Sequence, residues 1–210
     1  MLKNMLSVQS AATIVESYTD SALFRSRVVM QRHNYGRGEY KYFTYPLLRP
    51  VQQLRVGLYA RLVGIANGWN EAMDISVRYP ESHAEFLDRC HQAGQTKPTP
   101  LVLRYGPDDY NCLHQDLYGE HVFPLQAAFL LSRPQIGFTG GELVLTEQRP
   151  RMQSRVEVVP LDQGDGVIFA VNHRPVRGAR GFYRVNMRHG VSRLLSGERF
   201  TLGVIFHDAR

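Results

Sequence analysis

One short stretch of the chain carries two side chains that could bind the same metal ion. His114 and Asp116 are separated by a single residue. On a β-strand, residues two apart point to the same face, so this imidazole and this carboxylate supply two adjacent ligands. His83 and Glu85 have the same spacing, but helical periodicity is expected there, and residues two apart on a helix do not share a face. We therefore expect the metal site at His114 and Asp116.

A third ligand must come from elsewhere, because an oxygen-reactive Fe(II) site uses two histidines and one carboxylate and leaves other positions open. The candidates are His121, His173, His189 and His207. His189 is favoured because Arg199 follows it ten positions later, at the start of the last apolar segment. An arginine at that place could pair bidentately with a dicarboxylate inside a barrel. His173 is the alternative ligand, but it falls in an expected loop.

The order and spacing of these residues resemble the Fe(II)/2-oxoglutarate dioxygenases, whose pattern is H-x-D, a gap, a histidine and then a basic residue. The prolyl-4-hydroxylase-like branch also has a Tyr-Gly pair, an F-x-G-G-E-L turn and a G-D-x-x-x-F segment. The counterparts here are Tyr105-Gly106, residues 138–143 (FTGGEL), residues 164–169 (GDGVIF) and Arg188-His189. Arg199 stands where that branch usually carries lysine. The resemblance covers residues 100–207.

A narrower resemblance extends over residues 35–210. The matching segments are 40–43 (YKYF), 65–70 (IANGWN), 95–100 (QTKPTP), 114–126, 145–154 and 203–208. They are similar to a bacterial oxygenase family predicted to act on damaged, alkylated nucleic acid. The two resemblances imply that His114, Asp116 and His189 bind Fe(II), with 2-oxoglutarate as cosubstrate and O2 as oxidant.

The resemblance also implies a cosubstrate site around Arg199. Tyr105 lies at a family position that faces this pocket, although packing in the core is an alternative role for it. Thr201 shares the strand face of Arg199, so we expect its hydroxyl to donate to the same carboxylate. Asn111 and Tyr118 are candidates for the mouth of the site.

The implied activity is an oxidoreductase that couples oxidative decarboxylation of 2-oxoglutarate to hydroxylation of a substrate, with the cofactor performing the chemistry. On an N-methylated base, the hydroxymethyl product would release formaldehyde, which is oxidative demethylation and DNA repair. On a prolyl side chain or a small molecule, the product would be a stable alcohol, so a hydroxylase of either kind is the alternative. A jelly-roll metal-binding sensor or binding module is the non-enzymatic alternative.

The elements that must position these residues are short strands. Segments rich in β-branched or aromatic residues, separated by glycine turns, cover 101–105, 122–131, 142–146, 155–159, 167–171, 182–186 and 200–207. So many short strands predict a jelly roll, the double-stranded β-helix. We expect an α+β protein in one structural domain, with residues 1–99 as an N-terminal helical layer on a core of residues 100–210.

Three helices are expected in that layer. A capping box at residues 13–16 is expected to open the first, and Pro50 suits the first turn of the second. Pro80 is expected to start the third helix and Gly94 to end it. The second helix should bury a stripe of apolar residues at helical spacing, namely Val51, Leu54, Leu58, Leu62, Ile65 and Trp69.

The charge of the chain suggests a class of partner. Lysine and arginine number 25 against 19 acidic residues, a formal net charge of +6. If nucleic acid is the substrate, we expect a late cluster at the mouth of the site, consisting of Arg174, Arg177, Arg180, Arg184 and Arg188. A solvated, arginine-rich surface is the alternative interpretation.

Cysteine usage and hydropathy exclude several classes of protein. Two cysteines, Cys90 and Cys112, are too few for a disulfide scaffold or a cysteine-based zinc module, and both are expected to pack. No apolar run approaches the length of a membrane helix, so no membrane partner is expected. These observations predict a cytoplasmic protein and leave its oligomeric state open.

Overall fold

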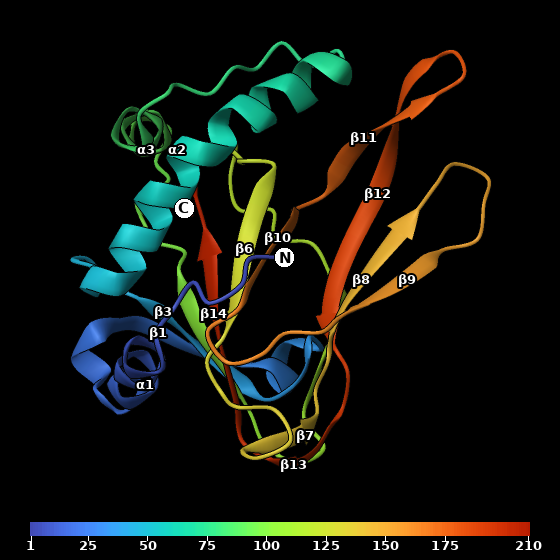
Figure 1. Ribbon diagram of the computed structural model, residues 1–210. Helices are drawn as coiled ribbons and strands as arrows, with labels where there is room; N and C mark the ends of the chain where they lie inside the picture. The colour runs from blue at the N-terminus through green and yellow to red at the C-terminus, as the bar shows by residue number, and fades with distance from the viewer.

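The computed structural model describes residues 1–210 and is built on two antiparallel sheets that face each other, with helices on one side (Figure 1). The large sheet runs in the order β1 (Phe24–Val29), β3 (Glu39–Phe43), β4 (Leu101–Tyr105), β14 (Arg199–Ile205), β6 (Leu125–Leu130) and β10 (Gly166–Ala170). The small sheet runs in the order β2 (Gly36–Arg37), β5 (Tyr110–His114), β12 (Gly181–Val191), β8 (Leu143–Gln148) and β9 (Arg155–Val159). This arrangement is the predicted double-stranded β-helix.

The remaining strands extend this core. β11 (His173–Gly178) pairs only with β12, and the two form a hairpin that projects beyond the sheets (Figure 1). β7 (Phe138–Gly140) and β13 (Leu194–Gly197) form a separate pair at the opposite end.

Helices cover the outer face of the large sheet. These are α1 (Val8–Glu16), α2 (Arg49–Ala72) and α3 (His83–Gln92). Two short 3-10 turns, η1 (Ser17–Thr19) and η2 (Ser21–Leu23), follow α1, and a third, η3 (Met30–His33), lies between β1 and β2. The two faces of β14 contact different parts of the molecule. Phe200, Leu202 and Val204 pack into the core beneath the helices. The alternate residues of β14 point the other way, toward the space between the sheets. None of the helices is both long and apolar enough to cross a membrane.

The helix boundaries differ from the expected ones at the first and third helices. α1 begins after Ser7, whose side chain accepts from the backbone N–H of Ser10, so residues 13–16 form its last turn and not its cap. α2 carries Pro50 in its first turn as predicted. The buried face of α2 does not include Ile65, which was expected in the apolar stripe but is 49% exposed. α3 begins at His83 and is followed by Gly94, which has a φ of +79°.

Residues 1–99 were expected to form a helical layer, but they also contribute strands to the core. Residues 24–43 contain β1, β2 and β3, and these add strands to both sheets. The strand on which His114 was expected is β5. No strand was expected at β7, β11 or β13, which bury almost none of their side chains and therefore show no apolar alternation.

A buried ion pair fastens α2 to the end of β14. The Arg55 Nη2 lies 2.7 Å from Asp208 Oδ1, and its Nε donates to the carbonyl oxygen of Ile205 at 2.9 Å. Tyr45 and His91 also contact the Asp208 carboxylate. Burial alone would raise the pKa of Asp208, but Arg55, His91 and Tyr45 together hold that pKa below its usual value. Such a pair holds its partners in one geometry, which steadies the strand that carries Arg199.

Candidate active site

The pairing of β5 with β12 places two histidines side by side. His114 is opposite His189 in the register, and their ring centroids are 4.1 Å apart. Between this pair and the next one, Asn111 opposite Val191, β5 has one residue more than β12. That extra residue is a β-bulge, which re-aims the side chains that follow it. Gly190 accommodates the bulge, because a Cβ there would lie 2.7 Å from the carbonyl oxygen of Asn111.

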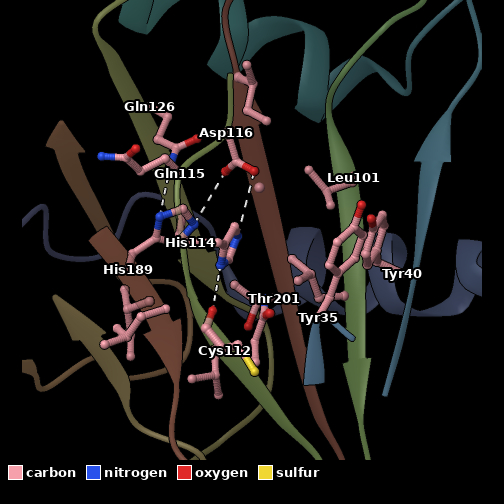
Figure 2. A pocket seen from close by; sticks show the side chains of 18 of the residues that line it. Tyr35, Tyr40, Leu101, Cys112, His114, Gln115, Asp116, Gln126, His189 and Thr201 are labelled. Atoms are coloured by element: carbon pink, nitrogen blue, oxygen red, sulfur yellow. Dashed lines mark hydrogen bonds and ion pairs between the residues drawn. The ribbon is translucent and has the colours of Figure 1, made fainter. Parts of the chain in front are cut away.

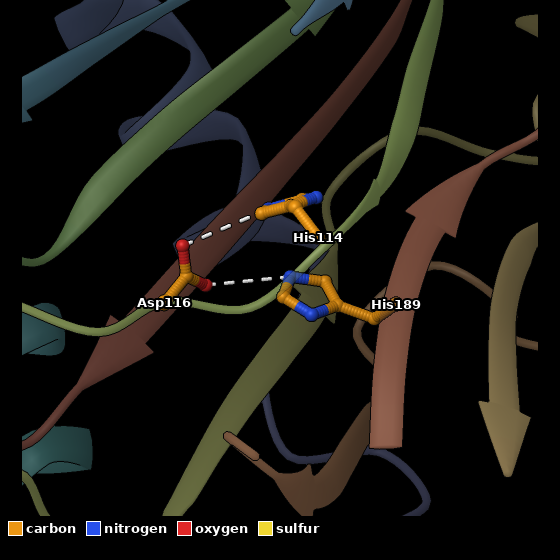
Figure 3. A group of neighbouring side chains, drawn as sticks. All are labelled: His114, Asp116 and His189. Atoms are coloured by element: carbon orange, nitrogen blue, oxygen red, sulfur yellow. Dashed lines mark ion pairs between the residues drawn. The ribbon is translucent and has the colours of Figure 1, made fainter. Parts of the chain in front are cut away.

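Asp116 completes a compact group with these histidines (Figure 3). It follows the end of β5, and its carboxylate oxygens lie 3.6 Å from His114 Nε2 and 3.3 Å from His189 Nε2. The potential ligand atoms of the three residues all lie within 4.8 Å of one another. The Asp116 side chain is 13% exposed. Two imidazoles and one carboxylate in this arrangement fit an iron site of the two-histidine, one-carboxylate kind.

Protonation favours metal binding at this group. Burial and the neighbouring His189 lower the pKa of His114, so its imidazole stays neutral and able to act as a ligand. Burial alone would raise the pKa of Asp116. The hydrogen bond from His189, the charges of both histidines and the hydroxyl of Tyr118 outweigh it and hold that pKa below its usual value. At neutral pH the group therefore offers a neutral imidazole at His114 and an anionic carboxylate at Asp116.

Outer hydrogen bonds orient the two histidines. The Nδ1 of His114 donates to the carbonyl oxygen of Cys112 at 2.7 Å, which directs Nε2 toward Asp116. The side-chain amide nitrogen of Gln126 lies 3.5 Å from His189 Nδ1. Partners of this kind fix ring orientation in metal sites. The Cys112 thiol is exposed, so the expectation that it packs is wrong, whereas Cys90 is buried as predicted.

Two further residues hold the segment between and after the potential ligands. Gln115 donates from Nε2 to Asn172 Oδ1 and to the Met187 carbonyl oxygen, both at 2.8 Å. The Tyr118 hydroxyl donates to Asp116 Oδ1 at 2.8 Å. The sequence placed Tyr118 near the site, two residues after Asp116, but gave no sign of the Gln115 contacts, because Asn172 and Met187 are distant in the chain.

A buried cation lies in the same space between the sheets. Arg199, the first residue of β14, is 2% exposed, and its Nη1 donates to Thr201 Oγ1 at 2.6 Å. No carboxylate lies within ion-pair distance of this guanidinium, and its Nε has no hydrogen-bond partner. Tyr105 is opposite Arg199 in the register and fully buried, and its hydroxyl is also unpartnered. Because buried polar groups without partners are costly, these donors fit an incoming carboxylate, such as that of 2-oxoglutarate.

The Gly140-Gly141 turn makes room for this arginine. A Cβ at Gly141 would lie 2.9 Å from Arg199 Cδ and 2.8 Å from Leu194 Cδ1. The φ of Gly141 is +65°, a conformation that side chains rarely adopt. From the sequence, Gly140 and Gly141 were expected only to form a turn. The structure shows that Gly141 must also lack a side chain because Arg199 packs against it.

One cavity of about 390 Å³ joins all of the expected site residues, and this volume lies within the range of small-molecule sites. Its lining includes His114, Asp116, His189, Tyr105, Arg199 and Thr201. Across the cavity from the histidines, Tyr35 and Tyr40 form part of an aromatic wall (Figure 2). Asn111 and Tyr118 also line the cavity. The cavity therefore offers a potential metal site, a buried cation and aromatic faces.

The other candidate histidines lie elsewhere. His173 was expected in a loop, but it is the first residue of β11, opposite Asn186. It lines a separate cavity with His121. His207 is fully buried, and its Nδ1 accepts from the backbone N–H of Phe123 at 3.2 Å. None of these three joins the group formed by His114, Asp116 and His189.

The late arginine cluster is not at the mouth of the site. No arginine of the Arg174–Arg188 segment lines the cavity. Arg174 pairs with Glu147, and the Nη2 of Arg184 donates to the Met73 carbonyl oxygen at 2.6 Å. The cluster follows the β11–β12 hairpin, which extends away from the sheets (Figure 1). Strand alternation also turns Arg188 to the face opposite His189.

Comparisons with known proteins give the family. Residues 38–209 match the model of a family described as "oxygenase, catalysing oxidative methylation of damaged DNA". The chain is 48% identical over 167 residues to uncharacterized proteins of two strains of Mycobacterium tuberculosis, which covers 80% of this chain and 72% of each relative.

Solved structures give the fold. A prolyl-4-hydroxylase of Pseudomonas putida aligns over 99% of this chain and 90% of its own, with a TM-score of 0.52 and 14% identity. A collagen prolyl hydroxylase of Paramecium bursaria Chlorella virus-1 aligns over 95% and 90%, also with a TM-score of 0.52 and 14% identity. These likenesses show a shared fold, with a double-stranded β-helix core, over nearly the whole chain. By its sequence, the chain belongs to the oxygenase family described as acting on damaged DNA, and it is an oxidoreductase whose site fits Fe(II), 2-oxoglutarate and O2.

Proposed function

We propose that the protein is an Fe(II)- and 2-oxoglutarate-dependent dioxygenase that removes alkyl groups oxidatively from the bases of nucleic acid. The observation that carries this proposal is the single cavity with a potential metal site, a buried guanidinium without a partner and an aromatic wall. The description of the matching family, which names damaged DNA, supports the substrate class.

The residues of the cavity have distinct roles in this proposal. His114, Asp116 and His189 hold Fe(II), which supplies oxygen activation as 2-oxoglutarate is oxidised to succinate and carbon dioxide. Arg199 binds the distal carboxylate of 2-oxoglutarate, because a guanidinium pairs with a carboxylate bidentately. Tyr105 donates its free hydroxyl to the same carboxylate. The buried position of both donors excludes water, which strengthens these interactions.

Chemistry sets the direction of the reaction on the base. An oxygenase inserts oxygen and carries no methyl donor, so the step that it can perform is hydroxylation of a methyl group already present. The carbon bound to the ring nitrogen gains a hydroxyl, and the product then loses formaldehyde as its C–N bond breaks and the nitrogen keeps the electron pair. The unmodified base is restored. This outcome is repair of an alkylation lesion.

The substrate class is tested by formaldehyde release. We expect the purified protein, supplied with Fe(II), 2-oxoglutarate and O2, to release formaldehyde from N-methylated single-stranded DNA or RNA in step with succinate formation. Unmethylated strands of the same sequence serve as the control. Hydroxylation of a prolyl peptide without formaldehyde release from either nucleic acid would contradict the proposal and favour the protein hydroxylase.

A second prediction concerns the metal. Alanine at His114, Asp116 or His189 should reduce 2-oxoglutarate turnover to background and also abolish tight binding of Mn²⁺, measured calorimetrically without oxygen. His173→Ala removes a histidine outside the group and should leave both measurements as in the wild type. Full Mn²⁺ affinity in the His189→Ala protein would overturn this ligand set.

A third prediction concerns the cosubstrate anchor. Arg199→Lys should raise the KM for 2-oxoglutarate and retain some activity, because a single ammonium replaces a bidentate fork. Arg199→Glu should eliminate binding, since two carboxylates would then meet in a site poor in water. Binding of 2-oxoglutarate is measured by quenching of intrinsic fluorescence as well as by turnover. Equal affinity in both variants and the wild type would place the anchor elsewhere.

A fourth prediction tests the space beside the anchor. Gly141→Ala should displace the Arg199 side chain and raise the KM for 2-oxoglutarate roughly tenfold, since a weakened charge-assisted hydrogen bond costs about 1.5 kcal/mol. Gly94→Ala is the matched control. Gly94 has a similar positive φ of +79°, but a Cβ there meets nothing within 4 Å. If Gly94→Ala raised the KM for 2-oxoglutarate as much as Gly141→Ala does, the effect would come from backbone strain at a positive φ and not from contact with Arg199.

A further inference from the structure

Residues 30–37, which we call the rim loop, lie at the edge of the cavity. The loop consists of η3, a left-handed turn at Asn34 with a φ of 59°, and β2. Its contacts with the core are fixed, because the backbone N–H of Cys112 donates to the Tyr35 carbonyl oxygen at 2.8 Å. Gly36 pairs with Asn111, and a Cβ at Gly36 would lie 2.3 Å from the carbonyl oxygen of Tyr110. The rim loop is thus attached to the strand that carries His114.

The rim loop exposes a stacked pair of aromatic rings. His33 and Tyr35 have ring centroids 5.3 Å apart and planes inclined by 23°. Tyr35 is 50% exposed although it also lines the cavity. A large aromatic side chain gains little stability at such a position, because half of its surface stays in water. Its ring is well placed to stack on a flat group that enters the cavity.

Two arginines flank this pair. Arg32 is exposed and forms no ion pair, and the nearest carboxylate to Arg37 is that of Asp109, with 3.9 Å between Nε and Oδ1. The other acidic side chains of this face are engaged, since Glu39 pairs with Arg27 and Arg104, and Asp108 lies 3.5 Å from Arg193. Arg32 is therefore unpaired, and Arg37 has only the long ion pair with Asp109, so both keep donors for a ligand. A guanidinium binds phosphate through paired hydrogen bonds.

We propose that the rim loop is the docking surface for a single strand of nucleic acid, and this inference rests on the proposed function. A base next to the target stacks on the His33–Tyr35 pair, while Arg32 and Arg37 contact the phosphates on either side. Alternating aromatic and cationic groups are how proteins bind single strands without reading their sequence. A duplex must first be opened before its base enters a cavity, so the single strand is the favoured form.

The test uses a fluorescein-labelled oligothymidine single strand and measures its binding by anisotropy at about 50 mM salt, where phosphate contacts are strong. Tyr35→Ala should weaken binding about 5- to 150-fold, the range that one stacked base supplies, whereas Tyr35→Phe keeps the ring and should bind as the wild type. Phe182→Ala is the matched control. Phe182 is an exposed aromatic residue, 54% accessible, on the β11–β12 hairpin away from the cavity.

Salt dependence separates phosphate contacts from stacking. The double variant Arg32→Glu with Arg37→Glu should make the slope of log affinity against log salt shallower by about 1.4, or about 0.7 for each lost contact on a single strand. Arg177→Glu with Arg180→Glu changes the same charge on the hairpin and should leave the slope unchanged.

Three other outcomes would contradict the docking surface, and one of them would also contradict the proposed function. If the hairpin variants lose affinity and the rim-loop variants do not, the docking surface is on the hairpin, and the proposed function stands. If the wild type releases formaldehyde from methylated strands while Tyr35→Ala binds oligothymidine normally, only the inference fails. If the wild type binds no oligonucleotide but binds a proline-rich peptide that Tyr35→Ala does not, both the inference and the proposed function fail.

Discussion

The register between β5 and β12 is the constraint on which the rest of the site depends. Side chains alternate between the two faces of a strand, so a slip of one residue would turn His189 outward and bring Arg188 into the cavity. The bulge in β5 makes the correct register possible, because it absorbs one residue between Asn111 and His114. Gly190 leaves room for that bulge. Local backbone geometry thus decides whether two imidazoles meet one carboxylate.

The second organising feature is a charge buried without a counter-ion. Arg199 begins a strand whose alternate residues either enter the helix-covered core or face the cavity, and this position gives it no contact with water. Its neighbours satisfy only part of its hydrogen-bonding capacity, through Thr201. A protein tolerates such a group when a ligand completes it, since binding to the folded state alone adds to stability. The buried pair of Arg55 and Asp208 is the contrasting case, in which the cation is satisfied within the fold.

The lining of the cavity contains groups of two different chemistries. The Arg199 guanidinium suits a carboxylate, and the tyrosine rings suit a flat group that can stack on them. The N-terminal third of the chain contributes to this lining. It covers the large sheet with α1 and α2, and through β3 and the rim loop it also supplies Tyr40, Tyr42 and Tyr35 to the cavity. The region expected as a covering layer therefore also builds the mouth of the site.

The jelly-roll core and the group of His114, Asp116, His189 and Arg199 could be predicted from the amino-acid sequence, because strand alternation, glycine turns and the spacing of these four residues are visible along the chain. The site role of Tyr105 came from the resemblance to the dioxygenases. The sequence did not show that β7, β11 and β13 are strands, since they bury almost none of their side chains and so have no apolar alternation. Nor did it locate the arginine cluster, which follows a hairpin away from the cavity. These features, the register of β5 on β12 and the packing of the rim loop depend on contacts between residues distant in the chain, so they could be seen only in the folded structure.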